Sequence, residues 1–507
     1  MRKKLIIAII AVAIIFTALF AFTNNDSTGA GTISVDANAL EDRANLVVDS
    51  KSLDENKGLY HTSDSDINAI LVKNGGALKL ADSIINKTGD TATSGDDADF
   101  YGVNSAVLVN TNGTLDISNV EINTNSKGSN GIFVTNAEAT ESDSSGDGQT
   151  GDGGQPPEAT GGGDAAQGGD GGQPPEMPDG AGDASQGGDA AQGGAQPGQE
   201  SVSGTTQADI KNVKITTHSD KSRGLDATYN GIINAENVII NTDGQSCAAL
   251  ATDRGEGQVH VRNSDINTGV SKDSGRGSPL IYSTGNITLE NSKGTSYVSQ
   301  IACIEGKNSI ELTNCDLKGY AEGNRQDGDT YVDLGGVFIY QSMSGDADVG
   351  TSHFSAKNSK LSIPEDSKVY ADAPMFHVTN TACVIDLENT ELSFGSGTFL
   401  EVSSQNQWGN SGSNGGTAEV NTNNEKIEGN VIVDSISSLN WTMKNTEFKG
   451  IVNSTGNATV NVAEGSTWTL TGDSTVSDLS VSGNIEYGSY SITVNGQKYD
   501  SSNPFKG

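Results

Sequence analysis

A carboxylate that could act on a glycosidic bond stands in the run Asn241-Thr242-Asp243-Gly244. Hydrolysis of such a bond needs at least two well-placed carboxyl groups, one acting as acid and one as base or nucleophile. No second carboxylate follows Asp243, because the next residues are Gln245-Ser246-Cys247. The Asn-Thr pair also recurs at Asn123-Thr124 and Asn267-Thr268. The recurrence favours a role in a turn, and Asp243 stays as the candidate acid or base of a hydrolase.

Elimination in a polyuronate needs other groups, namely a cation that neutralises the uronate carboxylate and an unprotonated Arg or Lys that takes the neighbouring proton. Three turn-like segments combine suitable charges: Asp220, Lys221 and Arg223; Lys272, Asp273 and Arg276; and Arg325, Asp327 and Asp329. We take Arg276 and Arg325 as lyase candidates. Solvated turn charge is the competing interpretation in so acidic a chain.

Four aspartates crowd the stretch from Thr88 to Tyr101, and they are Asp90, Asp96, Asp97 and Asp99. Carboxylate-rich loops suit weak binding of Ca²⁺. The chain has no EF-hand loop and no Gly-rich nonapeptide array, and its five histidines are scattered. We therefore expect no cofactor other than calcium in this loop, and no transition metal.

The composition excludes several classes of protein. The chain has 507 residues, with 65 acidic against 30 basic side chains, and its formal charge of −35 argues against a nucleic-acid partner. With 64 glycines and 5% aromatic residues, the chain is polar mainly through Ser, Thr, Asn and Gly, whereas coiled coils are rich in Ala, Glu, Lys and Leu, so we expect no long helices. Four cysteines are too few for a disulfide scaffold, so we expect them to be small buried apolar side chains.

The N-terminus has the pattern of an export signal. Three basic residues follow Met1, and an apolar run from Leu5 to Phe22 is broken only by Thr17. A secretory signal peptide and a retained membrane anchor both fit this pattern, and the sequence leaves the two alternatives open. Either one, assigned to residues 1–28, places the remainder outside the cytoplasm and limits membrane contact to this segment.

One short pattern recurs along most of the chain: apolar, any, apolar, any, Asn, small, any, apolar. Its clearest copy runs from Leu115 to Ile122, and neighbouring copies lie roughly 25 residues apart, which is the length of a solenoid rung. The central asparagines are Asn119, Asn212, Asn237, Asn263, Asn291, Asn314, Asn358, Asn389, Asn424 and Asn445, and Asp82 takes this place in an earlier copy. We expect their amides to stack as a ladder that satisfies polar groups where the chain bends.

The alternation of period two makes each copy a strand with one inward face, and a second short apolar run such as Val337-Phe338-Ile339 follows it. Two or three strands per rung, separated by Gly, Asn, Thr and Asp turns, predict an all-β protein built as a parallel β-helix. The alternating stretches 484–487 and 491–496 predict a capping hairpin, because an open solenoid edge needs protection.

The rungs resemble those of the right-handed β-helix proteins of the pectate-lyase-like superfamily, from about Asn68 to Leu470. Within that superfamily the chain resembles the adhesin-like and carbohydrate-binding surface proteins of bacteria and archaea, and the phrases Ile339–Asp346 and Val433–Leu439 are similar to ones in the carbohydrate-binding members. The Asn-Thr-Asp run is similar to one carboxylate motif of the β-helical polygalacturonases. Their paired-aspartate motif does not follow nearby, where Gln245-Ser246-Cys247 stands instead, and no Gly-His-Gly or Arg-Ile-Lys run occurs in the chain.

Residues 137–205 break the pattern with a Gly-, Pro-, Gln- and Asp-rich segment that has almost no large apolar side chain. Such a composition predicts disorder, and the segment joins one rung to the next, so it is an insert in a turn. The expected organisation is rungs over 29–136, the insert over 137–205, the main β-helix over 206–470 and a β cap over 471–507.

Two functions remain for an exported β-helix of this kind. The first is a non-catalytic adhesin or carbohydrate-binding protein of the cell surface or extracellular space, whose partner is an extracellular carbohydrate or another surface ligand. The second is a polysaccharide lyase or glycoside hydrolase on the same fold. We favour the first, because no complete catalytic constellation accompanies the rungs.

Overall fold

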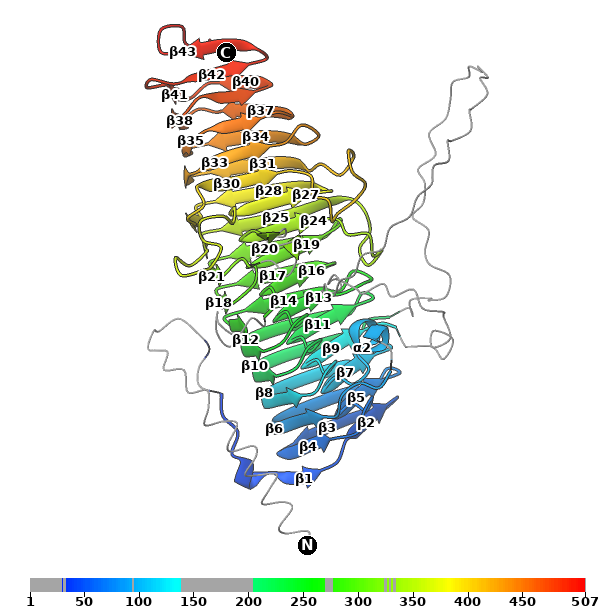
Figure 1. The fold of residues 1–507 in the computed structure, drawn as a ribbon. Helices are drawn as coiled ribbons and strands as arrows, with labels where there is room; N and C mark the ends of the chain where they lie inside the picture. Colours follow the sequence, from blue (N-terminus) through cyan, green and yellow to red (C-terminus); the bar gives the residue numbers. More distant parts are fainter. Residues whose placement is uncertain are drawn as a thin grey trace, which may run out of the picture.

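The computed structural model describes residues 30, 33–93, 95–137, 204–269, 277–322, 326–327, 330–331 and 334–506. In these residues the chain winds into a rod of stacked parallel strands, which climbs from the N-terminal rungs to the C-terminal ones (Figure 1). The prediction of an all-β parallel β-helix is therefore confirmed. The insert predicted at 137–205 lies outside the described residues except for its two ends.

A 21-stranded sheet holds the longer strand or strands of each rung. Its members are β1 (Glu41–Arg43), β3 (Ser52–Asn56), β4 (Gly58–Thr62), β6 (Ala77–Thr88), β8 (Thr114–Asn125), β10 (Gln207–Thr217), β12 (Ile232–Thr242), β14 (Gln258–Arg262), β15 (Asp265–Thr268), β17 (Asn286–Glu290), β18 (Lys293–Ser296), β20 (Ser309–Thr313), β21 (Asp316–Gly319), β25 (Thr351–Lys357), β26 (Lys360–Ser362), β28 (Ala382–Glu388), β29 (Glu391–Ser393), β31 (Thr417–Asn423), β34 (Ser438–Lys444), β37 (Asn457–Val462) and β40 (Asp478–Val481).

A 16-stranded sheet holds the short strand of each rung. Its members are β2 (Leu46–Asp49), β5 (Ile70–Lys73), β7 (Val107–Asn110), β9 (Ile132–Thr135), β11 (Leu225–Thr228), β13 (Leu250–Thr252), β16 (Ile281–Ser283), β19 (Ala302–Glu305), β24 (Val337–Tyr340), β27 (Phe376–Thr379), β30 (Thr398–Val402), β33 (Asn430–Val433), β36 (Val452–Ser454), β39 (Ser474–Val476), β42 (Ser491–Val494) and β43 (Gln497–Asp500).

The remaining elements are smaller. A four-stranded parallel sheet near the C-terminal end contains β32 (Lys426–Glu428), β35 (Glu447–Gly450), β38 (Thr467–Leu470) and β41 (Asn484–Glu486), and a small antiparallel pair joins β22 (Gln326–Asp327) to β23 (Thr330–Tyr331). The helices in the described residues are η1 (Ala37–Ala39) and α2 (Gly95–Tyr101). None of them is long or apolar enough to cross a membrane.

Each rung bends at its recurring asparagine. All ten asparagines have a positive φ, between 47° at Asn445 and 58° at Asn424, and Asp82 has one of 48°. This left-handed conformation is costly for most side chains and is tolerated best by Gly, Asn and Asp. The residue type at this place is therefore set by the backbone as well as by the ladder of amides.

The core fills the space between the sheets. The inward register expected around Asn314 is confirmed, since Ile310 and Leu312 are buried. In the C-terminal half the interior contains a continuous line of buried aromatic rings with centroids 4.7–5.7 Å apart, formed by Phe354, Phe376, Phe399, Trp441, Phe448 and Trp468. Dispersion and burial in this stack hold consecutive rungs together.

The strands before residue 137 pair directly with those after residue 205, and the C-terminal end closes with an antiparallel pair. Strand β8 pairs with β10, and β9 pairs with β11, so the chain leaves and re-enters between neighbouring rungs. At the C-terminal end, β42 pairs antiparallel with β43 through a turn at Asn495 and Gly496. The pairing expected for the hairpin was wrong: β41 pairs in parallel with β38 and continues the rungs, because its alternating residues lie in register with that strand.

Candidate functional site

The Asn-Thr-Asp run belongs to a turn. The hydroxyl of Thr242 donates to the carbonyl oxygen of Cys247 at 2.5 Å, and Thr217 and Thr268 make the same kind of bond at 2.6 and 2.5 Å. Next to this ladder, Oδ1 of Asp243 is buried without a hydrogen-bond partner. Burial lowers the pKa of His218, and the charge of Asp243 opposes that shift. Asp243 therefore has the imidazole of His218 as a neighbour.

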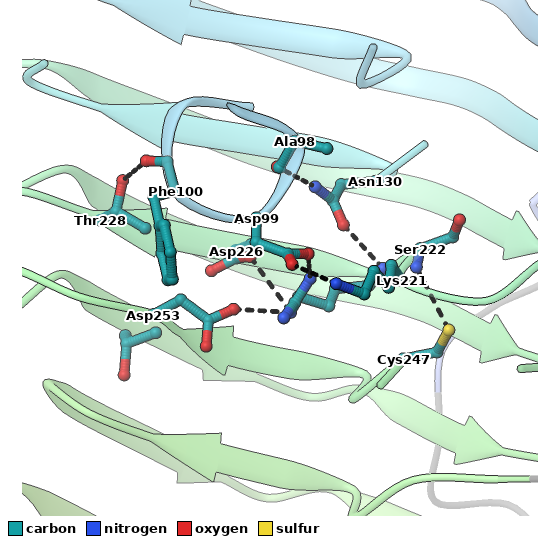
Figure 2. Close-up of polar contacts among 12 residues, drawn as sticks. Ala98, Asp99, Phe100, Asn130, Lys221, Ser222, Asp226, Thr228, Cys247 and Asp253 are labelled. Carbon is teal, nitrogen blue, oxygen red and sulfur yellow. Dashed lines mark hydrogen bonds and ion pairs between the residues drawn. The ribbon is translucent and has the colours of Figure 1, made fainter. Parts of the chain in front are cut away.

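The two arginine candidates, Arg276 and Arg325, lie outside the described residues, as do Lys272, Asp273 and Asp329. The remaining charged turn, which contains Lys221 and Arg223, is described, and these two side chains belong to a buried cluster of charges. Arg223 lies 2.9 Å from Oδ1 of Asp99, and Lys221 lies 2.9 Å from the other oxygen of the same carboxylate. Asp99 reaches them from helix α2 (Figure 2). From the sequence we expect Asp99 in a calcium loop and Lys221 and Arg223 in a separate charged turn, whereas the structure brings the three together.

Two further carboxylates face the same guanidinium. Nε of Arg223 lies 2.6 Å from Oδ2 of Asp253 and 3.5 Å from Oδ2 of Asp226 (Figure 2). Asp226 is fully buried, and neither of its oxygens accepts a hydrogen bond. Burial raises the pKa of Asp226 well above its usual range and that of Asp253 to about 6. Burial of several carboxylates around one arginine therefore favours protonation of part of the cluster.

Helix α2 seals this cluster from solvent. The hydroxyl of Thr228 donates to the carbonyl oxygen of Phe100 at 2.8 Å, and the ring of Phe100 lies 3.7 Å from the guanidinium carbon of Arg254. Arg254 in turn pairs with Asp346 at 2.5 Å. These contacts make the cluster a structural clamp between α2 and the 16-stranded sheet.

Two of the four aspartates of the expected calcium loop, Asp90 and Asp99, are held by different partners. Asp90 accepts the backbone N–H of Lys127 at 2.8 Å, while Asp99 is taken up by Arg223 and Lys221. Asp97 lies within α2, and the side chain of Asp96 lies outside the described part. No group of three His, Cys, Asp or Glu side chains in the described ranges is arranged to hold a metal ion.

Farther along the same face, an acidic and aromatic cluster covers the 16-stranded sheet. Glu305 is fully buried and accepts hydrogen bonds from the hydroxyls of Tyr282, at 2.8 Å, and of Ser342. Tyr340 packs on Trp408 with ring centroids 4.5 Å apart. Burial raises the pKa of Glu305, against the effect of these hydrogen bonds. The aromatic rings of this cluster pack mainly against one another, so they offer little free surface on which a sugar could stack.

A long groove lies elsewhere, at the bend of the rungs. It has a volume of about 1100 Å³ and is lined by two or more residues that follow each of five asparagines, and by the asparagines themselves: Asn291, Asn314, Asn358, Asn389 and Asn424. We call it the asparagine groove. Its asparagines are exposed, and their amides are linked between rungs. Nδ2 donates to Oδ1 of the preceding rung at 2.9 Å from Asn314 to Asn291, at 2.9 Å from Asn389 to Asn358 and at 3.2 Å from Asn424 to Asn389.

The ladder extends to earlier rungs. Asn119 donates to Asp82 at 3.3 Å, Asn212 donates to Asn119 at 3.1 Å, and Asn237 donates to Asn212. Asn263 has the same conformation in its rung, and Asn445 has it in the rung after the groove. Each link uses one amide hydrogen and one carbonyl lone pair, so further donor and acceptor capacity points outward.

A second set of hydrogen bonds, which we did not predict from the sequence, lies at the position after the asparagine in several rungs. There the backbone N–H donates to a side chain of the next rung. Ser359 accepts from Cys315 at 3.0 Å, whereas Glu425 accepts from Thr390 at 2.8 Å. The other carboxylate oxygen of Glu425 is buried without a partner, and burial raises the pKa of this residue to about 7. Glu425 is thus the unusual member of a ladder of hydroxyls.

No protein-family model and no curated protein matches this chain.

Proposed function

We propose that this chain is an exported β-helix protein of the cell surface or extracellular space, and that it binds carbohydrate in the asparagine groove without catalysing a reaction. The single observation that carries the proposal is the groove itself, which crosses several rungs and presents an asparagine amide and a charged side chain in each. A polysaccharide is a repeating ligand, and a repeating set of amides and charges meets it with many weak contacts.

The polar lining suits hydroxyl-rich ligands. Amide groups can donate to and accept from hydroxyls at once, and the outward capacity of the asparagine ladder is repeated at every rung. Export is supported by the basic and apolar N-terminal sequence, and the charge of −35 disfavours nucleic acid. Membrane contact, in this proposal, is confined to residues 1–28.

The test is a screen of the purified protein on a glycan array, run with assays for new reducing ends and for unsaturated products. We expect binding without turnover. As a matched pair, Asn358→Asp, which adds charge in the groove, should change glycan binding, whereas Asn440→Asp, on the exposed outer face of β34, should not. Absence of binding to every glycan would overturn the proposal.

A second candidate, a glycoside hydrolase, is favoured by one observation, the pair of Asp226 and Asp253 beside Arg223. Hydrolysis needs one protonated carboxyl and one ionised carboxylate, and environments that raise carboxyl pKa values can supply such a pair. The burial of both residues beneath α2 argues against it. Release of reducing ends that disappears in the Asp253→Asn variant would establish this alternative in place of simple binding.

A further inference from the structure

In the seven rungs from Asn263 to Asn445, the residue two positions after the asparagine is charged and its sign alternates, and in the five rungs of the asparagine groove this residue lines the groove. Asp265 pairs in register with Lys293, Lys293 with Asp316, Asp316 with Lys360, and Lys360 with Glu391. The next two rungs continue the alternation with Lys426 and Glu447, which also pair in register. The signs therefore alternate over seven rungs, and these residues pair in register continuously from Asp265 to Glu391.

The positive charges recur every second rung. Neighbouring strands lie about 4.8 Å apart, so Lys293 and Lys360 are spaced by roughly 9.6 Å along the groove. Lys426 follows two rungs after Lys360. A disaccharide unit in an extended polysaccharide has a comparable length. Asp316 and Glu391 stand between the lysines and place negative charge at the intermediate positions.

These charges remain available to a ligand. The lysines are bound to neighbouring carboxylates, with Lys360 2.7 Å from Glu391 and Lys293 3.6 Å from Asp265. The side chains of Lys360 and Glu391 are 41% and 66% exposed. Such exposed ion pairs contribute little to stability, so a lysine can exchange its protein carboxylate for one on a ligand at small cost.

We propose that the asparagine groove is specific for a linear polysaccharide that carries a carboxylate on every second sugar and a neutral, hydrogen-bonding sugar between. The inference rests on the proposed carbohydrate-binding function and adds the class of ligand. The lysines meet the uronates, the asparagine amides meet hydroxyl and N-acetyl groups, and Asp316 and Glu391 repel a uronate at an intermediate rung. The charge of −35 strengthens this rejection of more densely charged polymers.

The experiment is titration calorimetry with the whole protein and three sets of oligosaccharides of equal length. Hyaluronan fragments alternate uronate with N-acetylhexosamine, oligogalacturonates carry a carboxylate on every sugar, and dextran fragments are neutral. We expect hyaluronan fragments to bind most tightly. Lys360→Gln should weaken that binding about fivefold, near the upper end for one exposed ion pair.

Two further variants show whether the positions of the charges matter, apart from the net charge and from the stability of the fold. The exchange K360E/E391K keeps the net charge and the ion pair but moves the positive charge by one rung, so it should weaken hyaluronan binding at least as much as Lys360→Gln. Lys211→Gln removes an exposed lysine that lies 3.7 Å from Glu236 away from the groove, and it should leave binding unchanged.

Each contrary result has its own meaning. Equal binding of dextran and hyaluronan, unaffected by Lys360→Gln, would overturn the charge specificity and leave carbohydrate binding intact. Equal binding of oligogalacturonate, or retention of affinity in K360E/E391K, would overturn the inference from spacing. Binding of none of the three, together with an array that finds no glycan, would overturn both this inference and the proposed function.

Discussion

Nδ2 of Asn389 donates a hydrogen bond of 2.9 Å to Oδ1 of Asn358, which lies 31 residues earlier and one rung below. Both residues have a left-handed backbone, with φ values of 54° and 49°. Asparagine therefore has two roles at this position: it tolerates the left-handed backbone of the bend, and its amide hydrogen-bonds to the amide of the neighbouring rung. The ladder also forms the floor of the groove in which we propose that carbohydrate binds.

Substitutions of Asn389 separate the cost of losing the amide hydrogen bonds from the cost of the left-handed backbone. Asn389→Ala loses the amide bonds and places an alanine in the left-handed region, so it should lower the free energy of unfolding by about 2 kcal/mol. Asn389→Gly loses the same bonds but keeps the backbone freedom and should cost about half as much. Urea unfolding of both variants measures the difference. A glycine variant as unstable as the alanine variant would assign the whole cost to the amide.

The inward register at β20 predicts a large effect of a buried charge. Leu312 is 1% exposed, so Leu312→Asp should cost roughly 3–5 kcal/mol or prevent folding. The neighbouring Glu311 points outward and is exposed, and Glu311→Gln should change stability by less than about 0.5 kcal/mol. Circular dichroism during urea unfolding compares the two. Similar small effects would contradict the register.

In the clamp beneath α2, loss of the arginine and loss of one carboxylate should have opposite effects on stability. Arg223→Met leaves three buried carboxylates without their shared cation and should cost roughly 3–5 kcal/mol. Asp226→Asn removes a carboxyl that accepts no hydrogen bond and should be neutral or stabilising at pH 7. Thermal unfolding at pH 7 tests both. A strongly destabilised Asp226→Asn variant would show that the carboxylate is needed ionised.

Glu425 predicts a defined pH dependence. Its pKa is about 7 in the fold against an ordinary value of 4.5, so the folded state binds the proton more tightly than the unfolded state. The free energy of unfolding of the native protein should therefore fall as pH rises from about 4.5 to 7. Glu425→Gln keeps an oxygen acceptor for Thr390 and has no proton to lose.

The measurement is the difference in unfolding free energy between Glu425→Gln and the native protein from pH 4 to pH 8. The variant should gain relative stability through this interval and hold the gain above pH 7. A difference that does not change with pH would mean that Glu425 has an ordinary pKa in the fold.

The sequence predicts the architecture well because every rung repeats the same local rules. Alternation around Asn314 fixes the faces of the strand, and the spacing of the asparagines fixes the rung. The clamp could not be predicted, because Asp99 and Arg223 are 124 residues apart in sequence and meet only through stacked rungs. Helix α2 was missed for a related reason: its seven residues have too little periodicity to reveal a helix.

The charged wall of the groove could have been found from the sequence. Lys293, Asp316, Lys360 and Glu391 each stand two residues after a ladder asparagine, so aligning the copies on that asparagine reveals the alternating signs. The groove itself could not, since its depth depends on how the strands on either side of the bend diverge.

Hydrogen exchange of the whole protein with and without bound glycan, read by mass spectrometry, tests the central claim most directly. We predict that the bound glycan slows exchange in the peptides that contain Asn314, Asn358, Asn389 and Asn424, which line the asparagine groove, and leaves the outer face of the 16-stranded sheet unchanged. Protection confined to the peptides around Tyr340 and Trp408 would contradict the account and move the binding site to that face.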